Sequence, residues 1–413
     1  MATTELLSQP FSGQLGDYLI EQLTSSRYQT LNVVVAFAKN SGVLRLKKAL
    51  ERFRKNGSTV NAYVGIDLDG TSYEALTALL SLSDSLFVIH AESDQTFHPK
   101  IYDFSSDTEA LVIVGSHNLT GGGLWTNVES SAIIHIDTDG TISVHDQVEE
   151  YLLQLRRRSC FCVRIENQST IDKLLADGYV SKEVTGQIRR ATAAKAKLSS
   201  SPSREVTFVQ SLKAYIPDFT PSINEAHHSV RNVAGAPSTA TRIGLENKSE
   251  GSQTLWIATG AMTGGSRNIL DLSKRALVAH GDPSIIGFSL GEQGYMRGAV
   301  QFFGIDPADT EENRNITVNY NGTDFAGNSV IYPSGNGTWR LQIHGISSTG
   351  KKITSEFDPG YLAKKIITFT KINDGYFFMS VFSGEDLSEF VSVSLLVAYN
   401  GATKRCREFG IIL

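Results

Sequence analysis

The chain contains Phe97-His98-Pro99-Lys100 and then Val114-Gly115-Ser116-His117-Asn118, and these two stretches decide the fold class. His98 and Lys100 stand two residues apart, so on an extended strand both side chains project from the same face of a sheet. Each stretch adjoins a short apolar run that predicts a strand, in a part of the chain where strands and helices alternate. The sequence therefore predicts an α/β sheet with short strands flanking these two stretches.

The residue types in and after these stretches predict phosphoryl-transfer chemistry. Asn118 follows His98 by twenty positions, and Glu129 follows Asn118 by eleven. An imidazole that acts as nucleophile or acid, the Lys100 ammonium, an amide donor and a carboxylate make a site that can cleave a phosphodiester without a metal. The His-x-Lys pattern occurs only once in the chain, so a mechanism with two histidines needs a second subunit related by a two-fold axis.

The first 160 residues alternate between apolar β-branched runs and amphipathic segments. Such alternation predicts a mixed or parallel sheet with helices on its faces. The predicted strands are Leu31–Phe37, Val60–Ile66, Ser85–His90, Lys100–Phe104, Ala110–Val114 and Ser131–Ile136. The predicted helices are Gly42–Lys55, Ser72–Ser81 and Val144–Arg156.

The second part of the chain has a different character. Thr170–Leu198 reads as a helix that becomes basic between Arg189 and Lys197, and a segment rich in Ser, Asn, Pro and Gly continues to about residue 251. From Leu255 onward, period-two alternation and turn residues such as Asn-Asp-Gly predict hairpins that close into a barrel. The predicted strands include Ile316–Tyr320, Trp339–Ile343, Ile366–Ile372, Tyr376–Phe382 and Val391–Tyr399.

The composition restricts the partners that the protein can have. The formal net charge is −5 at pH 7, which excludes a protein that is basic throughout, so any contact with nucleic acid has to come from local basic patches. The first residues contain no basic segment followed by an apolar run, and no run of about 18 apolar residues occurs. The sequence therefore predicts a soluble cytoplasmic protein with no membrane contact.

The two stretches resemble the motif of the phospholipase D superfamily, which runs His-x-Lys, then an Asp, then Gly-Ser-x-Asn. His98, Lys100 and Gly115-Ser116-His117-Asn118 match this motif, whereas Ser105 stands at the place of its Asp. Glu129 looks like the carboxylate that replaces the Asp in one branch, the metal-independent restriction endonucleases of the BfiI and NgoFVII type. The resemblance therefore implies a nuclease that needs neither a metal nor another cofactor.

The end of the chain resembles the same enzymes more weakly. Leu255-Trp256-Ile257-Ala258-Thr259-Gly260 and Arg407-Glu408-Phe409-Gly410-Ile411-Ile412-Leu413 look like parts of their C-terminal B3-like DNA-binding barrel. The resemblance implies a multidomain protein of the α/β + β class. Its expected parts are a phospholipase D-like α/β/α sandwich in residues 1–160, a helical or irregular connector in 161–250 and a B3-like β-barrel in 251–413.

The resemblance also implies a role for each residue of the motif. His98 of one subunit attacks phosphorus and forms a phosphohistidine, and His98 of the other subunit protonates the leaving oxygen. Lys100 and Asn118 hold the non-bridging oxygens, Ser116 belongs to the catalytic set, and Glu129 orients or charges the site. The expected protein is a restriction endonuclease that dimerises through its nuclease domain and cleaves double-stranded DNA at or near a short sequence.

Basic residues of the C-terminal part are candidates for reading DNA, because barrel loops can present Arg and Asn to base edges. The candidates are Arg267, Asn268, Lys274, Arg275 and Arg314. A solvated charged surface explains any single one of them at least as well. The basic helix Arg189–Lys197 and the connector form a candidate docking site for an NTPase or helicase subunit, and ATP is expected to act only through such a subunit.

Two other functions stay open. A lipid phosphodiesterase of the same superfamily is disfavoured by the single motif, the lack of a membrane segment and the additional β-rich part. A DNA-binding subunit that cleaves only with a partner and ATP uses the same residues. The glycine run Gly121-Gly122-Gly123 reads equally well as a plain turn or as a close approach of backbone to phosphate. The remaining histidines of the predicted elements read as structural or exposed: His90, His135, His145, His280 and His344.

Overall fold

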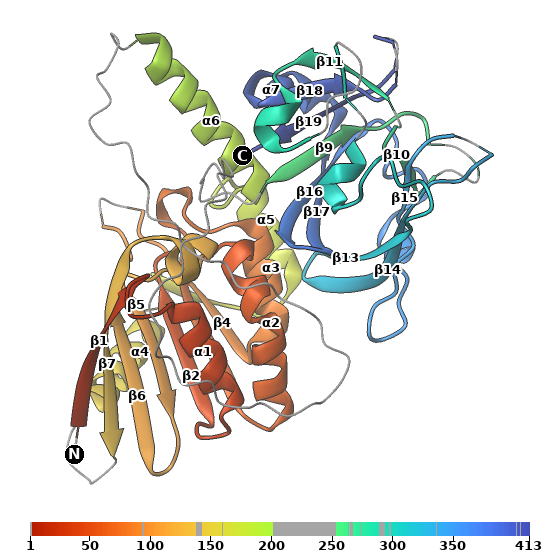
Figure 1. Ribbon diagram of the computed structural model, residues 1–413. Helices are drawn as coiled ribbons and strands as arrows, with labels where there is room; N and C mark the ends of the chain where they lie inside the picture. The colour runs from red at the N-terminus through yellow and green to blue at the C-terminus, as the bar shows by residue number, and fades with distance from the viewer. Residues whose placement is uncertain are drawn as a thin grey trace.

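The chain folds around two large mixed sheets, and Figure 1 shows the helices α2 and α3 of the first part lying next to the second sheet. The computed structural model describes residues 2–200 and 253–413, apart from 93–94, 138–142, 159, 263, 265–266, 274, 289–293, 297–298, 336, 402 and 405. Most of the predicted connector and the candidate Lys274 therefore lie outside the described residues. Among the helices that are described, none has the length and the apolar character needed to cross a membrane.

The first sheet has eight strands in the order β1-β7-β6-β5-β2-β3-β4-β8. The strands β2, β3 and β4 pair in parallel, and all other neighbours pair antiparallel. The strand bounds are β1 (Ala2–Gln9), β2 (Thr30–Val35), β3 (Thr59–Gly65), β4 (Ser85–Ile89), β5 (Lys100–Ser105), β6 (Glu109–Gly115), β7 (Glu129–Asp137) and β8 (Cys162–Ile165).

Helices cover both faces of this sheet. One core cluster packs α1 (Leu15–Thr24), α2 (Asn40–Lys55), α3 (Tyr73–Leu82) and α5 (Gln168–Ala176) on one face. A second cluster packs α4 (Val144–Arg156) on the other face, as Figure 1 shows. The structure therefore has the helix–sheet–helix layering that the alternating sequence predicts.

The helix α4 spans the predicted residues because local and tertiary signals agree. Ser143 Oγ accepts a hydrogen bond from the Asp146 N–H, and the Asp146 carboxylate accepts one from the Ser143 N–H. This reciprocal capping box satisfies donors that the first turn of a helix leaves open. Val148, Leu152 and Leu155 recur at helical spacing and are buried against the sheet.

The edge strand β1 is absent from the sequence prediction. Its residues from Ala2 to Leu6 are exposed, so they show no apolar alternation, and pairing with β7 alone orders them. At the opposite edge, β8 pairs with β4 and so extends the first sheet past residue 160.

The second sheet has eleven strands in the order β10-β15-β14-β13-β17-β16-β9-β19-β18-β11-β12. All neighbours pair antiparallel except β13 and β17. The strands are β9 (Thr254–Ala258), β10 (Ile269–Asp271), β11 (Ala276–His280), β12 (Tyr295–Met296), β13 (Arg314–Tyr320), β14 (Thr323–Ile331), β15 (Arg340–Gln342), β16 (Lys365–Asn373), β17 (Tyr376–Ser383), β18 (Leu396–Tyr399) and β19 (Glu408–Ile412).

The predicted closed barrel is not what the strand pairing shows. Within the described residues the edge strands β10 and β12 do not pair with each other, so the sheet stays open. It is nevertheless curled, because Asn400 after β18 donates a side-chain hydrogen bond to the carbonyl of Asp271 at the end of β10. The hairpin signals in the sequence report local pairing, whereas closure depends on long-range pairing of the edges.

Two further predictions are wrong in detail. Val391–Tyr399 is not one strand, because the chain forms the helix α7 (Leu387–Val393) before β18. Phe390 and Val393 are buried three residues apart, which suits a helical turn better than a strand. Thr170–Leu198 is not one helix either, because α5 ends at Ala176 and α6 (Glu183–Ser200) begins after a turn in which Gly178 has a φ of 80°.

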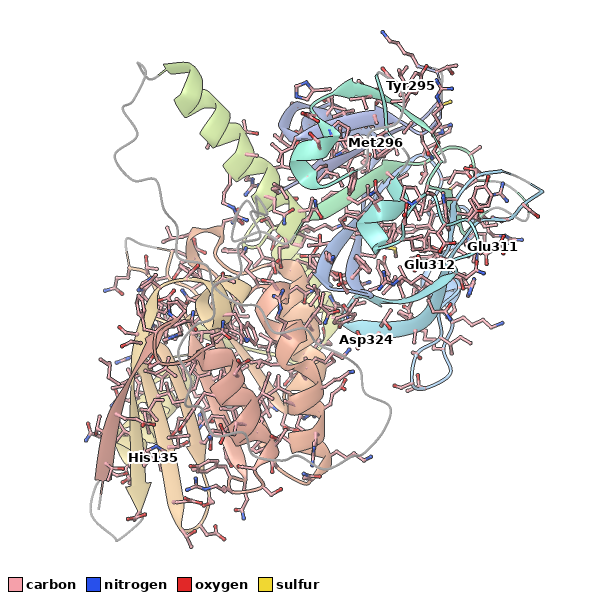
Figure 2. All side chains as sticks on the ribbon, in the orientation of Figure 1. His135, Tyr295, Met296, Glu311, Glu312 and Asp324 are labelled. Carbon is pink, nitrogen blue, oxygen red and sulfur yellow. The ribbon has the colours of Figure 1, made fainter. Side chains whose placement is uncertain are left out.

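Contacts between α2, α3 and the second sheet join the two parts. Lys47 of α2 donates to the Gly322 carbonyl at 2.9 Å and forms an ion pair with Asp324 at 3.0 Å. Figure 2 labels Asp324 at this junction. Ser380 of β17 donates to Glu74 of α3 at 2.8 Å, and burial is the main cause that raises the pKa of Glu74. The helices α2 and α3 and the second sheet thus share a partly buried polar boundary.

Candidate active site

Four neighbouring strands bring the motif residues to one end of the first sheet. The register pairs Val35 with Lys100, Ile101 with Val114, and Gly115 with Ser131. The carboxyl ends of β2 and β6 therefore lie beside the starting ends of the antiparallel strands β5 and β7. Residues that are far apart in the sequence converge at this edge.

His98 and Lys100 are in contact, although His98 precedes β5 and does not lie on a strand. The Nζ atom of Lys100 lies 2.8 Å from Nδ1 and 3.0 Å from Nε2 of the His98 ring, and it donates to the His98 carbonyl at 2.9 Å. Lys100 is buried and His98 is exposed. Partial desolvation and then the Lys100 charge lower the pKa of His98, so its neutral form dominates at pH 7. A neutral imidazole on the surface can act as a nucleophile.

Asn118 is held by the backbone that follows β2. Its Oδ1 atom accepts a hydrogen bond from the Phe37 N–H at 3.1 Å, and the Phe37 carbonyl accepts one from the Leu119 N–H at 3.1 Å. Because the amide oxygen is engaged in this way, the Nδ2 group is the end of the side chain that can donate to a phosphate oxygen. The half-buried amide is thus oriented before any substrate binds.

Glu129 and Ser116 form a second pair at the same edge. The Ser116 hydroxyl donates to Glu129 Oε2, and the Ser130 N–H donates to Ser116 Oγ at 3.1 Å. Asn127 Nδ2 donates to Glu129 Oε1 at 3.2 Å. Burial is the main cause that lowers the pKa of Lys100, and the charge of Glu129 opposes this effect. The carboxylate therefore helps to keep the Lys100 ammonium protonated.

Phe37 is a site residue that sequence reasoning missed. Its ring lies edge-on to the His98 ring, with centroids 5.7 Å apart, and the Lys100 ammonium lies 6.0 Å from its centroid. The same residue holds Asn118 through its backbone. The sequence could have indicated Phe37, because this residue follows an apolar strand at the edge where parallel strands end, and ligands bind at such edges.

The glycines near Asn118 serve internal packing. A Cβ atom on Gly123 would come within 2.4 Å of the Asn118 carbonyl oxygen, and one on Gly115 within 2.2 Å of the Ser130 carbonyl oxygen. The run continues into a π-helical turn, Gly122–Thr126, in which Trp125 is buried. Packing against protein atoms therefore requires glycine at Gly123, whether or not the backbone of the run also approaches a phosphate.

His117 lies between Ser116 and Asn118 but faces the interior. Its Nδ1 atom is 2.6 Å from Ser131 Oγ on β7, and burial lowers its pKa to about 4. Its carbonyl accepts a hydrogen bond from the Tyr102 hydroxyl at 3.3 Å. The neutral ring ties the end of β6 to β7 and so sets the spacing between the Ser116–Asn118 segment and Glu129.

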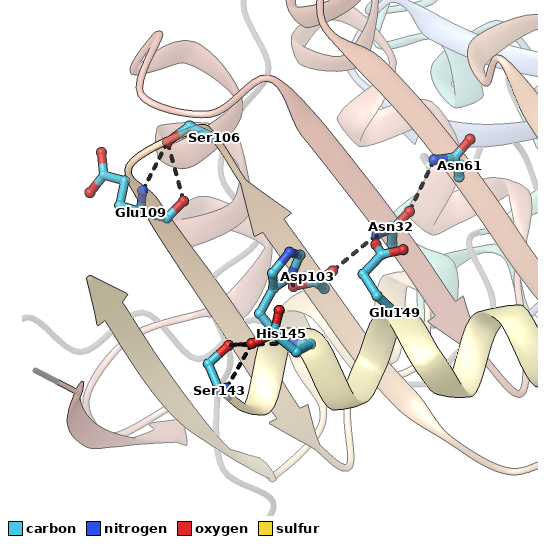
Figure 3. Close-up of polar contacts among 9 residues, drawn as sticks. Asn32, Asn61, Asp103, Ser106, Glu109, Ser143, His145 and Glu149 are labelled. Carbon is cyan, nitrogen blue, oxygen red and sulfur yellow. Dashed lines mark hydrogen bonds and ion pairs between the residues drawn. The ribbon is translucent and has the colours of Figure 1, made fainter. Parts of the chain in front are cut away.

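A second polar cluster lies under α4, as Figure 3 shows. Asp103, His145 and Glu149 place possible ligand atoms within 4.8 Å of one another, a donor set that suits zinc. Asn32 Nδ2, however, donates to Asp103 at 3.0 Å and to Glu149 at 2.7 Å, and His145 Nδ1 lies 2.7 Å from Asp103. Asn61 holds the Asn32 oxygen at 3.0 Å. The carboxylates are thus satisfied by protein donors, which is the arrangement of a structural network.

This network makes a pH-dependent contribution to stability. The hydrogen bond to Asp103 is the main cause that raises the pKa of His145 above its ordinary value. A raised pKa means that the stabilisation is fully present below the unfolded-state pKa of about 6.5 and is lost as pH rises through the folded-state pKa. We expect His145→Gln to lower the free energy of unfolding by about 1–3 kcal/mol at pH 5.5 and by less at pH 8.5.

Urea unfolding of both proteins across this pH range measures the difference. The control is His135→Gln, because His135 is more exposed and lies 3.5 Å from Glu5 at the surface. If His145→Gln lowers the free energy of unfolding by the same amount from pH 5.5 to 8.5, the pH-dependent role of His145 is wrong.

Four of the candidate DNA-reading residues lie in the described strands and loops of the second sheet. Arg267 is exposed, and Arg275 lies over the Tyr295 ring at 3.9 Å (Tyr295 is labelled in Figure 2). Asn268 donates to the Ile343 carbonyl at 2.8 Å. Arg314 donates to the carbonyls of Phe303 and Gly304 at 3.0 and 2.6 Å. Arg267 and Arg275 thus present exposed side chains, whereas Asn268 and Arg314 hold neighbouring loops.

The chain is similar to several solved structures. A phospholipase D family member, Nuc from Salmonella typhimurium, matches with 16% identity and a TM-score of 0.30, over 40% of this chain and 100% of that chain. NucT from Helicobacter pylori matches with 12% identity and a TM-score of 0.30, over 40% and 100%. Phosphatidylserine synthase from Haemophilus influenzae matches with 12% identity and a TM-score of 0.32, over 48% and 47%. No family model and no curated protein matches the chain.

Proposed function

We propose that this chain is a metal-independent endodeoxyribonuclease of the restriction type, built on the phospholipase D-like motif. The observation that carries the proposal is the convergence of His98, Lys100, Asn118 and Glu129 at one end of four adjacent strands. Their order in the sequence does not by itself require them to meet. A nucleophile, a cation, an oriented amide and a carboxylate at one edge are the groups that phosphodiester cleavage needs.

In the proposed reaction, a ring nitrogen of neutral His98 attacks phosphorus and the P–O bond to the leaving group breaks. The leaving oxygen takes a proton from His98 of a second copy. Water then attacks the phosphohistidine, the P–N bond breaks, and the second histidine recovers a proton from that water. Lys100 and the Asn118 amide hold the non-bridging oxygens, while Glu129 stabilises the Lys100 charge and is itself positioned by Ser116.

An exposed apolar surface beside the site supports a dimer. Leu6 of β1 pairs with Ala132 of β7, which pairs with Val114 of β6, so the three side chains form one row on one face. Leu6 is 67% exposed and Val114 is 40% exposed. The next row along these strands, Ser8 and Ser130, adjoins Ser116. Val114 shares the α4 face of the sheet with Val112, whereas Lys100 shares the opposite face with Tyr102. The proposed dimer therefore continues from this row around the end of the sheet, where a second histidine can approach the first, as a single-motif chain requires.

The second sheet is the proposed DNA-reading part, with Arg267 and Arg275 as its exposed candidates. Arginine side chains of this kind contact guanine edges or phosphates. The basic helix Arg189–Lys197 and the connector 161–250 are the proposed docking site for an NTPase or helicase subunit in the alternative, partner-dependent form of the nuclease.

Incubation of the purified chain with plasmid DNA in EDTA tests the proposal against its rivals. Discrete fragments that do not appear with His98→Ala support a nuclease that acts alone. Cleavage only after a partner subunit and ATP are added supports the subunit alternative. Release of headgroups from phospholipid vesicles, with intact DNA, would overturn the proposal in favour of a lipid phosphodiesterase.

A further inference from the structure

Arg45 of α2 lies behind the segment that carries Asn118. Its Nη1 atom donates to the Ser41 carbonyl at 2.7 Å, and its guanidinium lies 5.7 Å from the centroid of the Trp125 ring. A Cβ atom on Gly121 would come within 2.9 Å of that same Nη1 atom. Burial lowers the pKa of Arg45 to about 10, so the side chain is still charged at neutral pH. The guanidinium therefore packs against residues 119–126.

The start of α2 packs directly on the same segment. A Cβ atom on Gly42 would come within 2.6 Å of the Leu119 carbonyl oxygen. The Lys39 N–H donates to that oxygen at 3.0 Å, and the Gly121 N–H donates to Ser41 Oγ at 3.1 Å. The Asn118 side chain stays oriented only while this segment keeps its place, because Asn118 and Leu119 share the Phe37 backbone as their partner.

Arg45 also reaches the second sheet. Its Nη2 atom donates to the carbonyl of Ile372 at the end of β16, at 2.8 Å. The Ile372 side chain and Phe378 of β17 are buried in the core of the first part, so the β16–β17 hairpin is anchored there. One side chain thus contacts the Asn118 segment and the hairpin together.

We propose that Arg45 is a positioning residue that makes the placement of Asn118 depend on the docked β16–β17 hairpin. This inference rests on the proposed nuclease function for its catalytic consequence, but not for its structural part. The planar guanidinium can donate to two carbonyls in different directions while its face lies on an indole, and no other side chain matches that geometry. Loss of Arg45 should therefore loosen residues 119–126 and reduce the contribution of Asn118 to the reaction.

Lys47→Met provides the matched control for Arg45→Met. Lys47 is also a basic residue of α2 that contacts the second sheet, through Gly322 and Asp324. Among the polar contacts of the described residues, Lys47 has none with the Asn118 segment. Both variants weaken the junction between the parts. Only Arg45→Met should also change the segment from Leu119 to Asn127. Arg45→Lys serves as the conservative variant, because it keeps the positive charge but loses the planar guanidinium and its N–H donors in fixed directions.

Hydrogen–deuterium exchange of the full-length proteins tests the structural part without any activity. We expect peptides covering 119–127 to exchange at least about tenfold faster in Arg45→Met, which corresponds to about 1.4 kcal/mol of local stability. In Lys47→Met the same peptides should exchange at the wild-type rate. Equal exchange of this segment in the two variants would overturn the inference, whether or not the chain is a nuclease.

Steady-state hydrolysis of bis(4-nitrophenyl) phosphate tests the catalytic part. We expect Arg45→Met to lower kcat roughly tenfold with little change in KM, and to cause no further loss in an Asn118→Ala background. Arg45→Lys should recover only part of kcat. Fully additive losses would show that Arg45 does not act through Asn118 and would overturn the inference. Hydrolysis that does not depend on His98 would instead overturn the proposed function and leave the exchange result to decide the role of Arg45.

Discussion

Replacing His98 with alanine is expected to lower the rate of DNA cleavage in EDTA by roughly 10⁴-fold or more, the size of loss seen when a catalytic nucleophile is removed. The expected loss is large because the same residue supplies the nucleophile from one copy and the acid from the other. The structure places its exposed ring against the Lys100 ammonium, at 2.8 Å from Nδ1. Gel-based cleavage of a linear DNA containing the recognised sequence measures the effect.

The control for this substitution is His135→Ala. His135 lies on β7 of the same sheet and is labelled in Figure 2. Within the described residues, its one ion-pair partner is the exposed residue Glu5. We expect the control to cleave at the wild-type rate. Retention of more than about one per cent of activity by His98→Ala, with normal folding, would contradict the assigned role.

Replacing Leu6 with aspartate is expected to abolish dimers and cleavage together. Leu6 is the most exposed member of the apolar row that runs through Ala132 to Val114 beside the site. Burial of an unpaired carboxylate in an interface costs about 3 kcal/mol, which raises the dissociation constant of the dimer roughly 100-fold. Sedimentation velocity and cleavage assays over the same concentration range measure both effects.

Val163→Asp is the matched control, because Val163 is 49% exposed on β8 at the opposite edge of the same sheet. It should leave dimers and activity unchanged. An active monomeric Leu6→Asp protein would refute the two-copy site. A dimer that persists in Leu6→Asp would show that the interface lies on another face of the protein.

The site could be predicted in large part because its parts are local. His98 and Lys100 are neighbours in sequence, and Asn118 follows and Glu129 begins strands that hydrophobic patterning reveals. The parallel strands β2, β3 and β4 are apolar runs, as expected for strands covered on both faces. The contribution of Phe37 is not visible in this way, since it depends on the register that places the end of β2 beside Asn118.

The rest of the fold depends on pairing that no local pattern reports. The strand β1 is mostly exposed and is ordered by β7, whose paired residues lie at least 120 positions later in the chain. Leu387–Val393 is helical because Phe390 and Val393 pack into a cluster with Trp256, and Ser394 accepts the Trp256 indole N–H at 2.8 Å. The alternation around Val391 was equally compatible with a strand. Tertiary contacts, rather than propensity, decide such short segments.

The central claim is a covalent intermediate on His98. Rapid quenching of the wild-type protein with a 5′-labelled DNA duplex in EDTA, followed by proteolysis and mass spectrometry under conditions that preserve P–N bonds, tests it directly. We expect a DNA phosphate attached to a ring nitrogen of His98, at up to one adduct per dimer, and none with His98→Ala. Cleavage that proceeds with no adduct, or an adduct on Ser116, would contradict it.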